Sequence, residues 1–253
     1  MNERSIALAI ADTQAYVLAN NAIQACTTNF EFQQVHVFTD APQYWPHYHT
    51  VLVDKMHGIE DYNRIILEQL PNVVMEDYCL VVQFDGFILN AESFSKDFYN
   101  FDYIGAVWPN YPQHRVGNGG FSWRSKKLLK AVAQIAYLRE AGEAEDLFIC
   151  RTMRTELEAN YGCVFADEAT AKSFSYEAVP YEQPAFGFHG IFNLPMVYRN
   201  NLKFLVENLP QTVIAARLPH LLYGAQLLDA AQRTEFEDLL SLAMQTIPLA
   251  QTV

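Results

Sequence analysis

An aspartate follows the most strand-like stretch of the sequence, a position from which a carboxylate can bind a metal ion. The stretch is residues 78–84, YCLVVQF, and Asp85 and Gly86 come directly after it. A carboxylate at a strand end can hold a divalent cation that bridges the two phosphates of a diphosphate. An Asp-Gly pair is also a common turn that needs no ligand, so this segment alone leaves both interpretations open.

Three glycines surround Asn118 in residues 115–125, RVGNGGFSWRS. Glycines allow the backbone to approach a ligand closely and to expose its N–H groups. Their spacing matches neither GxGxxG nor GxxxxGKS/T, which excludes a dinucleotide-binding loop and a P-loop. The alternative is a glycine-rich hairpin without a ligand.

Glu145 and Asp146 stand at the expected start of a helix over residues 145–160. Acidic residues favour the first turn of a helix because they interact with the helix dipole, which is a purely structural explanation. The functional alternative is a general base, a carboxylate that takes a proton from a reacting hydroxyl group. The sequence alone leaves both interpretations open.

Histidines offer two further candidates. His189 lies between glycines in an aromatic segment, residues 186–192, and can be either a hydrogen-bonded core residue or a metal ligand supplied late in the chain. His47, His49 and His57 could instead form the metal centre of a metallohydrolase. An H-x-H pair at the start of a strand is a weak signal for such a centre.

An alternation of strands and helices is expected to position these candidates. Strands are expected at residues 5–11, 35–40, 50–54 and 78–84, and helices from Asp12 or Thr13 to about Thr28, at 60–70 with Pro71 as the stop, at 125–140 and at 145–160. This order predicts an α/β fold with a mixed, mostly parallel sheet flanked by helices. Ligands of such sheets bind at the C-terminal ends of the strands, which are followed here by Asp12, Asp40 and Asp85.

Composition narrows the class of protein. The 253 residues carry a net charge of −12, which argues against a nucleic-acid partner, and their 51% hydrophobic content excludes a mostly disordered chain. No apolar run reaches the roughly 18 residues of a membrane span, and the run at residues 6–11 is too short for a signal sequence. Reduced thiols and a cytoplasmic location are expected, because the cysteines are scattered without CxxC or metal-binding spacing. They are Cys26, Cys79, Cys150 and Cys163.

Five segments in this order resemble the GT-A glycosyltransferases, which use nucleotide-sugar donors. The segments are QFDG at residues 83–86, DYIGAVWP at 102–109, VGNGGFSWRS at 116–125, EDLFIC at 145–150 and FGFHG at 186–190. More closely, they resemble a bacterial and fungal family of proposed glycosyltransferases that is catalogued largely as a domain of unknown function. The resemblance covers about residues 5–195 and implies a GT-A-like, Rossmann-related fold for that part.

The resemblance also implies a metal and a nucleotide-sugar site. GT-A enzymes end a central strand with D-x-D, and the matching triplet here is Gln83-Phe84-Asp85, with Asp85 in the place of the metal-binding aspartate. His189 matches a late histidine that completes the coordination, so Mn²⁺ or Mg²⁺ bound by Asp85 and His189 is expected. With the strand-end positions included, the residues expected to bind the nucleotide sugar are Ala9, Ala11, Asp12, Thr13, Asp40, Tyr62, Asn63, Gln83, Phe84, Asp85, Gly117, Asn118, Gly119 and Gly120.

The implied reaction is the transfer of a sugar, expected from a UDP-sugar, to an acceptor hydroxyl with inversion. The resemblance places the catalytic base in the pair Glu145-Asp146, and Asp146 is favoured because its shorter side chain is less mobile. Arg115 or Arg124, beside the glycines, is expected to contact the diphosphate or the acceptor. The alternative is a catalytically inactive nucleotide-sugar-binding or scaffold protein on the same fold.

Residues 196–253 are expected to form a helical extension to a catalytic domain at residues 1–195. Apolar residues recur from Val213 onward, and Pro219 and Gly224 are expected to divide this stretch into separate helices. So much apolar surface must be buried. It is expected either to pack on the catalytic domain or to form a contact in a homodimer or with a partner.

Overall fold

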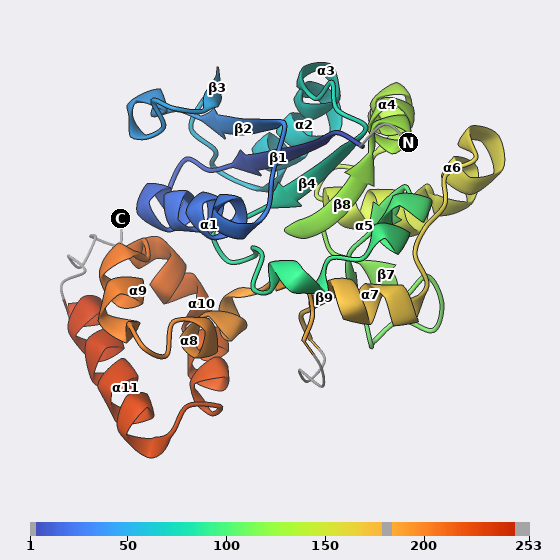
Figure 1. The fold of residues 1–253 in the computed structure, drawn as a ribbon. Coiled ribbons are helices and arrows are strands. Elements are labelled where there is room, and N and C mark those ends of the chain that lie inside the picture. Colours follow the sequence, from blue (N-terminus) through green and yellow to red (C-terminus); the bar gives the residue numbers. More distant parts are fainter. Residues whose placement is uncertain (1–3, 179–183, 246–253) are drawn as a thin grey trace. The chain divides into compact units, whose positions relative to one another are not determined.

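The computed structural model describes residues 4–178 and 184–245, in two compact units. The first unit, Met1–His189, is an α/β domain, and the second, Gly190–Val253, is helical (Figure 1). Both features agree with the fold class predicted from the sequence. Among the helices of the described residues, none combines the length and the apolar character that crossing a lipid bilayer requires.

A six-stranded sheet forms the centre of the α/β unit. Its strands, in spatial order, are β3 (His49–Leu52), β2 (Gln34–Thr39), β1 (Ile6–Ala11), β4 (Tyr78–Val82), β8 (Phe121–Ser125) and β5 (Tyr103–Ile104). The first four run parallel, whereas β8 is antiparallel to both of its neighbours. Strands β1 and β4 are buried along their whole length, as apolar strands covered by helices on both faces should be. The predicted mostly parallel sheet is therefore confirmed.

Helices lie on both faces of this sheet (Figure 1). The helices of the α/β unit are α1 (Tyr16–Asn29), α2 (Ile59–Arg64), α3 (Leu70–Val73), α4 (Lys126–Ile135), α5 (Glu145–Leu147), α6 (Arg154–Tyr161) and α7 (Glu168–Phe174). On one face, the alanines of β1 pack in a cluster with Ile66 and Leu70. Leu8 and Ile10 point to the opposite face, because side chains alternate along a strand, and α1 lies on that side.

Two short ribbons complete the α/β unit near the strand ends. β6 (Ala106–Val107) pairs antiparallel with β7 (Val116–Gly117), and β9 (Ser175–Tyr176) pairs parallel with β10 (Gly187–Phe188). The glycine-rich segment follows β7 directly, and His189 follows β10 directly. The ribbons therefore fix the backbone from which two of the predicted site segments begin.

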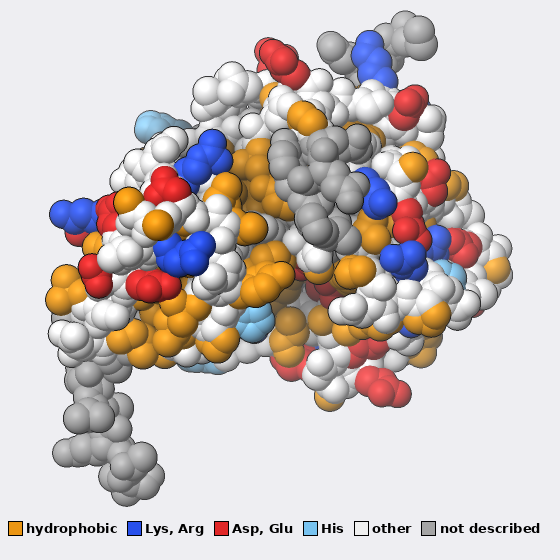
Figure 2. Space-filling view, turned by 90° about the horizontal axis from the view of Figure 1, so that it is seen from below, with side chains coloured by type: hydrophobic (Ala, Val, Ile, Leu, Met, Phe, Trp, Pro, Cys, Tyr) orange, Lys and Arg blue, Asp and Glu red, His pale blue; other side chains and the backbone are white. Residues whose placement is uncertain are grey.

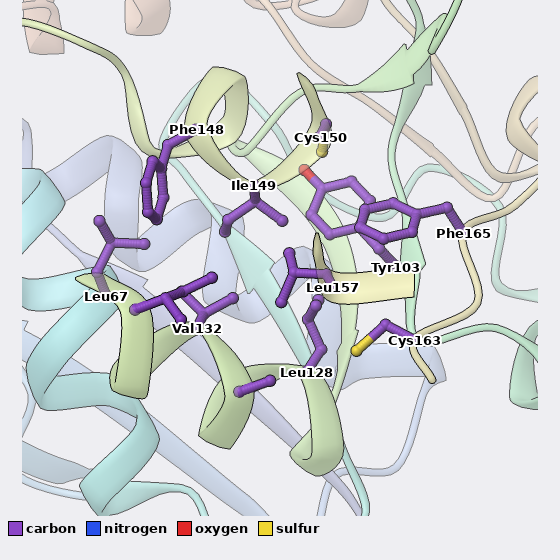
Figure 3. Packing of buried hydrophobic residues seen from close by; sticks show 12 residues of the cluster. Leu67, Tyr103, Leu128, Val132, Phe148, Ile149, Cys150, Leu157, Cys163 and Phe165 are labelled. Carbon is purple, nitrogen blue, oxygen red and sulfur yellow. The ribbon is translucent and has the colours of Figure 1, made fainter. Parts of the chain in front are cut away.

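A second hydrophobic cluster, shown in Figure 3, includes Phe148, Ile149 and Cys150, which follow Glu145 and Asp146 closely in the chain. It joins α4 and α6 to the turn that follows α5. All four cysteines are free and buried, as their scattered spacing predicts. The labelled members of the cluster are Leu67, Tyr103, Leu128, Val132, Phe148, Ile149, Cys150, Leu157, Cys163 and Phe165.

The helix predicted to stop at Pro71 continues past it. After α2 the chain forms a π-helical turn, Ile65–Gln69, and then α3, which contains Pro71. The prediction that Pro71 ends the helix is therefore wrong. In the π turn the N–H of Leu70 bonds to the carbonyl of Ile65, five residues back. This wider turn gives room to a ring that has no N–H to donate.

The helical unit contains α8 (Leu194–Val197), α9 (Leu202–Asn208), α10 (Gln211–Ala225) and α11 (Ala230–Gln245). Helix α10 runs through Pro219, so the prediction that this proline divides the stretch is wrong. The stretch does divide just after Gly224, because α10 ends at Ala225 and α11 begins at Ala230. An internal proline removes one helical hydrogen bond without ending this helix. A Cβ atom at Gly224 would overlap the carbonyl oxygen of Phe192, so this glycine allows a close approach of backbones. The end of the predicted extension, residues 246–253, lies outside the described residues.

Three large apolar side chains of the helical unit are exposed. Tyr223, Leu227 and Leu242 are 71%, 66% and 61% exposed, respectively. Figure 2 shows hydrophobic side chains intermingled with charged ones of both signs on one face of the protein. These three residues are candidates for the homodimer or partner contact, which stays a prediction.

Candidate functional site

The candidate site lies at the C-terminal ends of β1 and β4, where the strand order of the sheet reverses. From β1 the chain moves outward through β2 to β3, and it then returns to β4 on the other side of β1. Ligands of open α/β sheets bind at such a reversal. Asp12 follows β1, and Asp85 comes shortly after β4. Both aspartates therefore stand where the topology places a ligand.

A tight turn after β4 holds Asp85. Gln83 and Gly86 exchange backbone hydrogen bonds of 3.0 and 3.1 Å, which leaves Phe84 and Asp85 at the tip of the turn. The Asp-Gly turn of the structural alternative is thus present. Asp85 is nevertheless only 9% exposed, and its Oδ1 lies 3.7 Å from Nε2 of His189. The turn therefore presents a buried carboxylate to an imidazole.

Polar groups surround both ring nitrogens of His189. Nδ1 lies 3.1 Å from Oε1 of Glu177 and 2.6 Å from Nδ2 of Asn118, and Nε2 lies 3.2 Å from Oε1 of Gln83. The ring rests against the backbone of Gly120, where a Cβ atom would overlap Nε2. Glycine at this position is therefore a requirement for the imidazole to reach the strand end.

The charge of His189 follows from its neighbours. Burial alone would lower its pKa, but the carboxylates of Asp85, Glu177 and Asp146 outweigh that effect and raise the pKa to about 9. The imidazole is therefore positively charged near neutral pH when no other cation is close. Burial raises the pKa of Glu177, yet hydrogen bonds from His189 and Asn118 bring it below its ordinary value.

Asp146 meets the glycine-rich segment at the start of α5. Its Oδ2 accepts a hydrogen bond of 3.0 Å from the N–H of Gly119, and its Oδ1 accepts one of 2.8 Å from the N–H of Leu147. Burial, followed by the negative charge of Glu145, raises the pKa of Asp146 to about 6. A carboxylate with a pKa close to ambient pH is well suited to general-base catalysis.

Glu145 points to a different partner. Its Oε1 lies 2.9 Å from Nη2 of Arg124, and these two residues are only 2% and 1% exposed. Arg124 also donates to the hydroxyl of Ser122 and to the carbonyl of Gly119. The expectation that Arg124 contacts a ligand is corrected here, because its guanidinium lies inside the protein and neutralises Glu145.

Arg115 also has a carboxylate partner. Its Nη1 lies 3.1 Å from Oε1 of Glu168 in α7, in an ion pair that is partly exposed. Water screens such a pair, which contributes little to stability. The placement of Arg115 at the diphosphate or the acceptor stays a prediction.

Asn63 and Tyr62 of α2 have different surroundings. Asn63 is fully buried, donates through Nδ2 to the carbonyl of Glu143 at 2.9 Å, and accepts through Oδ1 from the N–H of Glu145 at 2.9 Å. It thereby fixes the backbone that enters α5. The ring of Tyr62 packs against the hydrophobic cluster on one face of the sheet, and its hydroxyl lies among site residues, beside Gln83 and close to the charges of Glu145 and Asp146. The amide of Asn63 is committed to the backbone, which explains its place better than a nucleotide contact does.

Asp12 and Asp40 follow the ends of the neighbouring strands β1 and β2, and Tyr16 of α1 contacts Asp40. Oδ1 of Asp12 accepts from the N–H groups of Gln14 and Ala15 at 2.9 and 2.7 Å, in the turn that precedes α1. The N-cap of α1 is Ala15, which has no side-chain cap, so the prediction that the helix begins at Asp12 or Thr13 is wrong. The hydroxyl of Tyr16 donates to Oδ1 of Asp40 at 2.8 Å. Burial is the main cause that raises the pKa of Asp12 to about 6, and the charges of Asp85 and Asp40 add to it. The three aspartates therefore act on one another electrostatically.

The remaining predicted nucleotide-binding residues occupy varied positions. Ala9 and Ala11 are buried and pack in the cluster on one face of the sheet, so their side chains serve the core. Oγ1 of Thr13 accepts from the N–H of Met56 at 3.0 Å. Gly117 lies under the ring of Trp108, where a Cβ atom would overlap the indole.

Two aromatic residues near Asp40 were not expected from the sequence. The rings of Tyr16 and Tyr44 stack with centroids 4.8 Å apart at an interplanar angle of 11°, and Tyr44 is 52% exposed. Glu177, beside His189, was not expected either. None of the three stands in a motif, and a tyrosine or glutamate in a polar segment is no signal of a site, so only the folded chain identifies them.

The other histidines do not converge on a metal centre. His47 and His57 are exposed, while Nδ1 of His49 lies 2.9 Å from Nδ1 of His36 on the neighbouring strand. Within residues 4–178 and 184–245, no group of three or more His, Cys, Asp or Glu side chains is placed to hold a metal. The metallohydrolase interpretation therefore has no structural support in the described part of the chain. Asp85 and His189 likewise form a pair of neighbouring side chains, not a complete cage, and their role as metal ligands stays a prediction.

Comparisons with known proteins identify a family and several solved structures. The family described as "Protein of unknown function (DUF5672)" matches residues 47–189, more than half of the chain. No curated protein matches the sequence. Similar solved structures include the apo form of the glycosyltransferase GlyE of Streptococcus pneumoniae TIGR4, with 15% identity, a TM-score of 0.46, and coverage of 74% of this chain and 54% of that one. This chain thus spans about half the length of GlyE.

Two further structures show lower identity. A glycosyltransferase involved in glycosylation of the major capsid of PBCV-1 has 9% identity, a TM-score of 0.48, and coverage of 74% of this chain and 93% of that one. The mannosyltransferase PcManGT from Pyrobaculum calidifontis, in complex with GDP-Man and Mn²⁺, has 10% identity, a TM-score of 0.44, and coverage of 100% and 77%. With TM-scores below 0.5, these similarities carry no functional argument by themselves.

Proposed function

This chain belongs to the family described as "Protein of unknown function (DUF5672)", and we propose that it is a glycosyltransferase that moves a sugar from a UDP-sugar to an acceptor hydroxyl. One observation carries the proposal. Asp85, His189 and Asp146 come from distant parts of the sequence. His189 and Asp146 both contact the segment Gly117–Gly120, and Asp85 lies beside His189 at the end of β4. This is the arrangement that the five sequence motifs imply.

The donor atoms at Asp85 suit Mn²⁺ or Mg²⁺. They comprise a carboxylate oxygen of Asp85, the amide oxygen of Gln83 and Nε2 of His189, and carboxylate and carbonyl oxygens are the ligands these ions prefer. The site is also strongly acidic, because Asp85 and Asp40 lie close enough to Asp12 to raise its pKa. A diphosphate can approach these carboxylates only with a cation to compensate. When bound, such an ion supplies Lewis-acid stabilisation of the departing diphosphate.

Asp146 acts as the general base in this proposal. Its carboxylate takes the proton of the acceptor hydroxyl while the acceptor oxygen bonds to C1 of the sugar. The bond between C1 and the diphosphate oxygen breaks at the same time, and its electron pair leaves with UDP. Attack opposite to the leaving group inverts the anomeric centre. Glu145 is the weaker candidate because Arg124 already neutralises it.

The nucleoside end is assigned to the ends of β1 and β2. Asp12 and Asp40 offer carboxylate oxygens to hydroxyl or ring N–H groups, and Tyr16 holds Asp40 in place. Tyr44 stacks on Tyr16 and keeps half of its surface exposed, so it is a suitable ring to cover a base.

The test combines binding with turnover. We expect UDP and Mn²⁺ together to raise the melting temperature more than either alone, because ligands that bind the folded state stabilise it. Asp85→Ala should abolish this joint effect and leave the fold intact, since Asp85 stands in a turn outside the core. A panel of UDP-sugars is then screened for UDP release. Joint stabilisation without release from any sugar would favour the inactive binding protein, and no joint stabilisation would refute the assignment.

A further inference from the structure

Glu177 and His189 are brought together by the short parallel ribbon of β9 and β10. Ser175 pairs with Gly187 and Tyr176 with Phe188, so Glu177 and His189 are the next residues in register. The N–H of His189 continues the ladder by donating to the carbonyl of Tyr176 at 3.0 Å. Partners in register on neighbouring strands place their side chains on the same face. The ribbon thus aligns a carboxylate with an imidazole.

The contact between the two side chains is direct and largely shielded from water. Oε1 of Glu177 lies 3.1 Å from Nδ1 of His189, and each side chain is 17% exposed. Asn118 reinforces it, because its Oδ1 accepts from the N–H of Phe121 at 3.2 Å, which turns its Nδ2 toward the pair. Glu177 thus has two hydrogen-bond partners, Nδ1 of His189 and the side chain of Asn118.

The arrangement gives the two ring nitrogens different roles. A carboxylate can only accept a hydrogen bond, so Nδ1 must carry a proton. Nε2 then remains for the atoms on the other side of the ring, Oδ1 of Asp85 at 3.7 Å and Oε1 of Gln83 at 3.2 Å. Histidines that bind metals characteristically donate their second N–H to a carboxylate, which fixes the tautomer and makes the ligating nitrogen more basic.

We propose that Glu177 is a positioning residue that keeps a proton on Nδ1 of His189, so that Nε2 offers its lone pair to a divalent cation beside Asp85. This inference rests on the cation site of the proposed function. On binding, Nε2 gives up its proton to solvent, and Glu177 retains the one on Nδ1. No motif of the sequence includes Glu177, which lies twelve residues before His189.

The first measurement needs no variant. In protein with ¹⁵N-labelled histidine, saturated with UDP and Mg²⁺, the ring nitrogens of His189 should show a protonated Nδ1 and a metal-bound, proton-free Nε2. A proton on Nε2 with a free Nδ1 would overturn the proposal. So would a ring that is unchanged by Mg²⁺ and UDP.

The second measurement compares Glu177→Gln with Glu158→Gln. The glutamine at position 177 keeps the size but removes the charge, and we expect the affinity for Mn²⁺ in the presence of UDP to fall about tenfold to a hundredfold. Glu158 pairs with Arg154 of its own helix, α6, rather than with a residue assigned to the site, so its variant should bind Mn²⁺ as the parent does. Unchanged Mn²⁺ affinity in a folded Glu177→Gln protein would overturn the proposal.

These readouts separate the two proposals. Metal binding and tautomer do not require turnover, so weaker Mn²⁺ binding in Glu177→Gln together with no UDP release from any sugar would refute only the glycosyltransferase. Normal turnover with an Nδ1 that carries no proton would refute only the role of Glu177.

Discussion

Asp146 has the surroundings of a base whose protonation state changes within the physiological range. Its pKa is raised to about 6 because burial and the charge of Glu145 oppose ionisation more than Gly119 and Leu147 favour it. The unprotonated form, which accepts the proton of the acceptor, therefore predominates only above about pH 6. We expect kcat to rise roughly tenfold per pH unit below this value and to level off above it.

Removal of the base should separate chemistry from binding. In Asp146→Asn we expect kcat to fall by about two to four powers of ten, with the affinity for UDP and Mn²⁺ little changed. Glu145→Gln should mainly lower stability, because it leaves the buried Arg124 without its counter-charge. Steady-state kinetics and melting temperatures of both variants check this. A greater loss of kcat in a stable Glu145→Gln protein would identify the other acid as the base.

The buried carboxylate of Asp12 should lower the free energy of unfolding near neutral pH. Its pKa rises from 3.8 to about 6 in the folded protein, so folding favours the protonated form. The stability contributed by this group is complete below about pH 4 and is lost as the pH rises through about 6. Asp12→Asn keeps the oxygen that accepts from Gln14 and Ala15, and we expect it to stabilise the protein by about 3 kcal/mol at pH 7.5 but not at pH 4.

Chemical denaturation at the two pH values measures the effect of Asp12→Asn. Asp167→Asn is the matched control of opposite sign, since backbone and side-chain hydrogen bonds with Thr170 lower the pKa of this exposed helix cap. It should lower the stability at pH 7.5 and matter less at low pH. Equal effects of Asp12→Asn at both pH values would show that burial does not raise the pKa of Asp12 in the folded protein.

At the scale of elements, the glycine-rich segment contacts side chains from several distant parts of the chain. Gly119 donates to Asp146, and Gly120 leaves room for the ring of His189 and for Oε1 of Gln83. We expect Gly120→Ala to displace the imidazole and to abolish the joint stabilisation by UDP and Mn²⁺, with a loss of stability of about 1–3 kcal/mol.

The control for Gly120→Ala is Gly58→Ala. Gly58 has an extended backbone, and a Cβ atom there meets no atom within 4 Å, so this variant should behave as the parent. Thermal shift with UDP and Mn²⁺, each alone and together, compares the two variants. Retained joint stabilisation in Gly120→Ala would mean that the ring of His189 is not needed beside Asp85.

At the scale of the whole molecule, all residues assigned to the site belong to the unit Met1–His189. Leu240 of α11, in the helical unit, is 2% exposed, so Leu240→Ala should destabilise that unit by about 2–5 kcal/mol. Below the melting transition, the variant should still bind UDP and Mn²⁺ with the affinity of the parent. Calorimetric titration at low temperature checks this expectation.

The comparison variant is Leu227→Ala. This leucine is 66% exposed, and its removal should change the melting temperature little. If a folded Leu240→Ala protein failed to bind UDP, residues beyond His189 would have to contribute to the site.

Strands and single motifs were predictable from the sequence because their signals are local. Uninterrupted apolar runs identify β1 and β4, and parallel order then places Asp12 and Asp85 at one edge of the sheet. Local signals mislead where packing takes over. Pro71 and Pro219 resemble helix stops, yet a π turn accommodates the first and the second lies inside α10.

The sequence by itself determined which residue types could do chemistry and on which strand ends they stand. Only the tertiary structure decided which of them are engaged elsewhere: Arg124 is used to neutralise Glu145, and Asn63 to hold the backbone before α5. It also brought Glu177 to His189, and His189 to Gln83 across 106 positions of sequence. The physical reason is that buried polar groups must find partners, and the available partners depend on how distant segments pack rather than on neighbours in the chain.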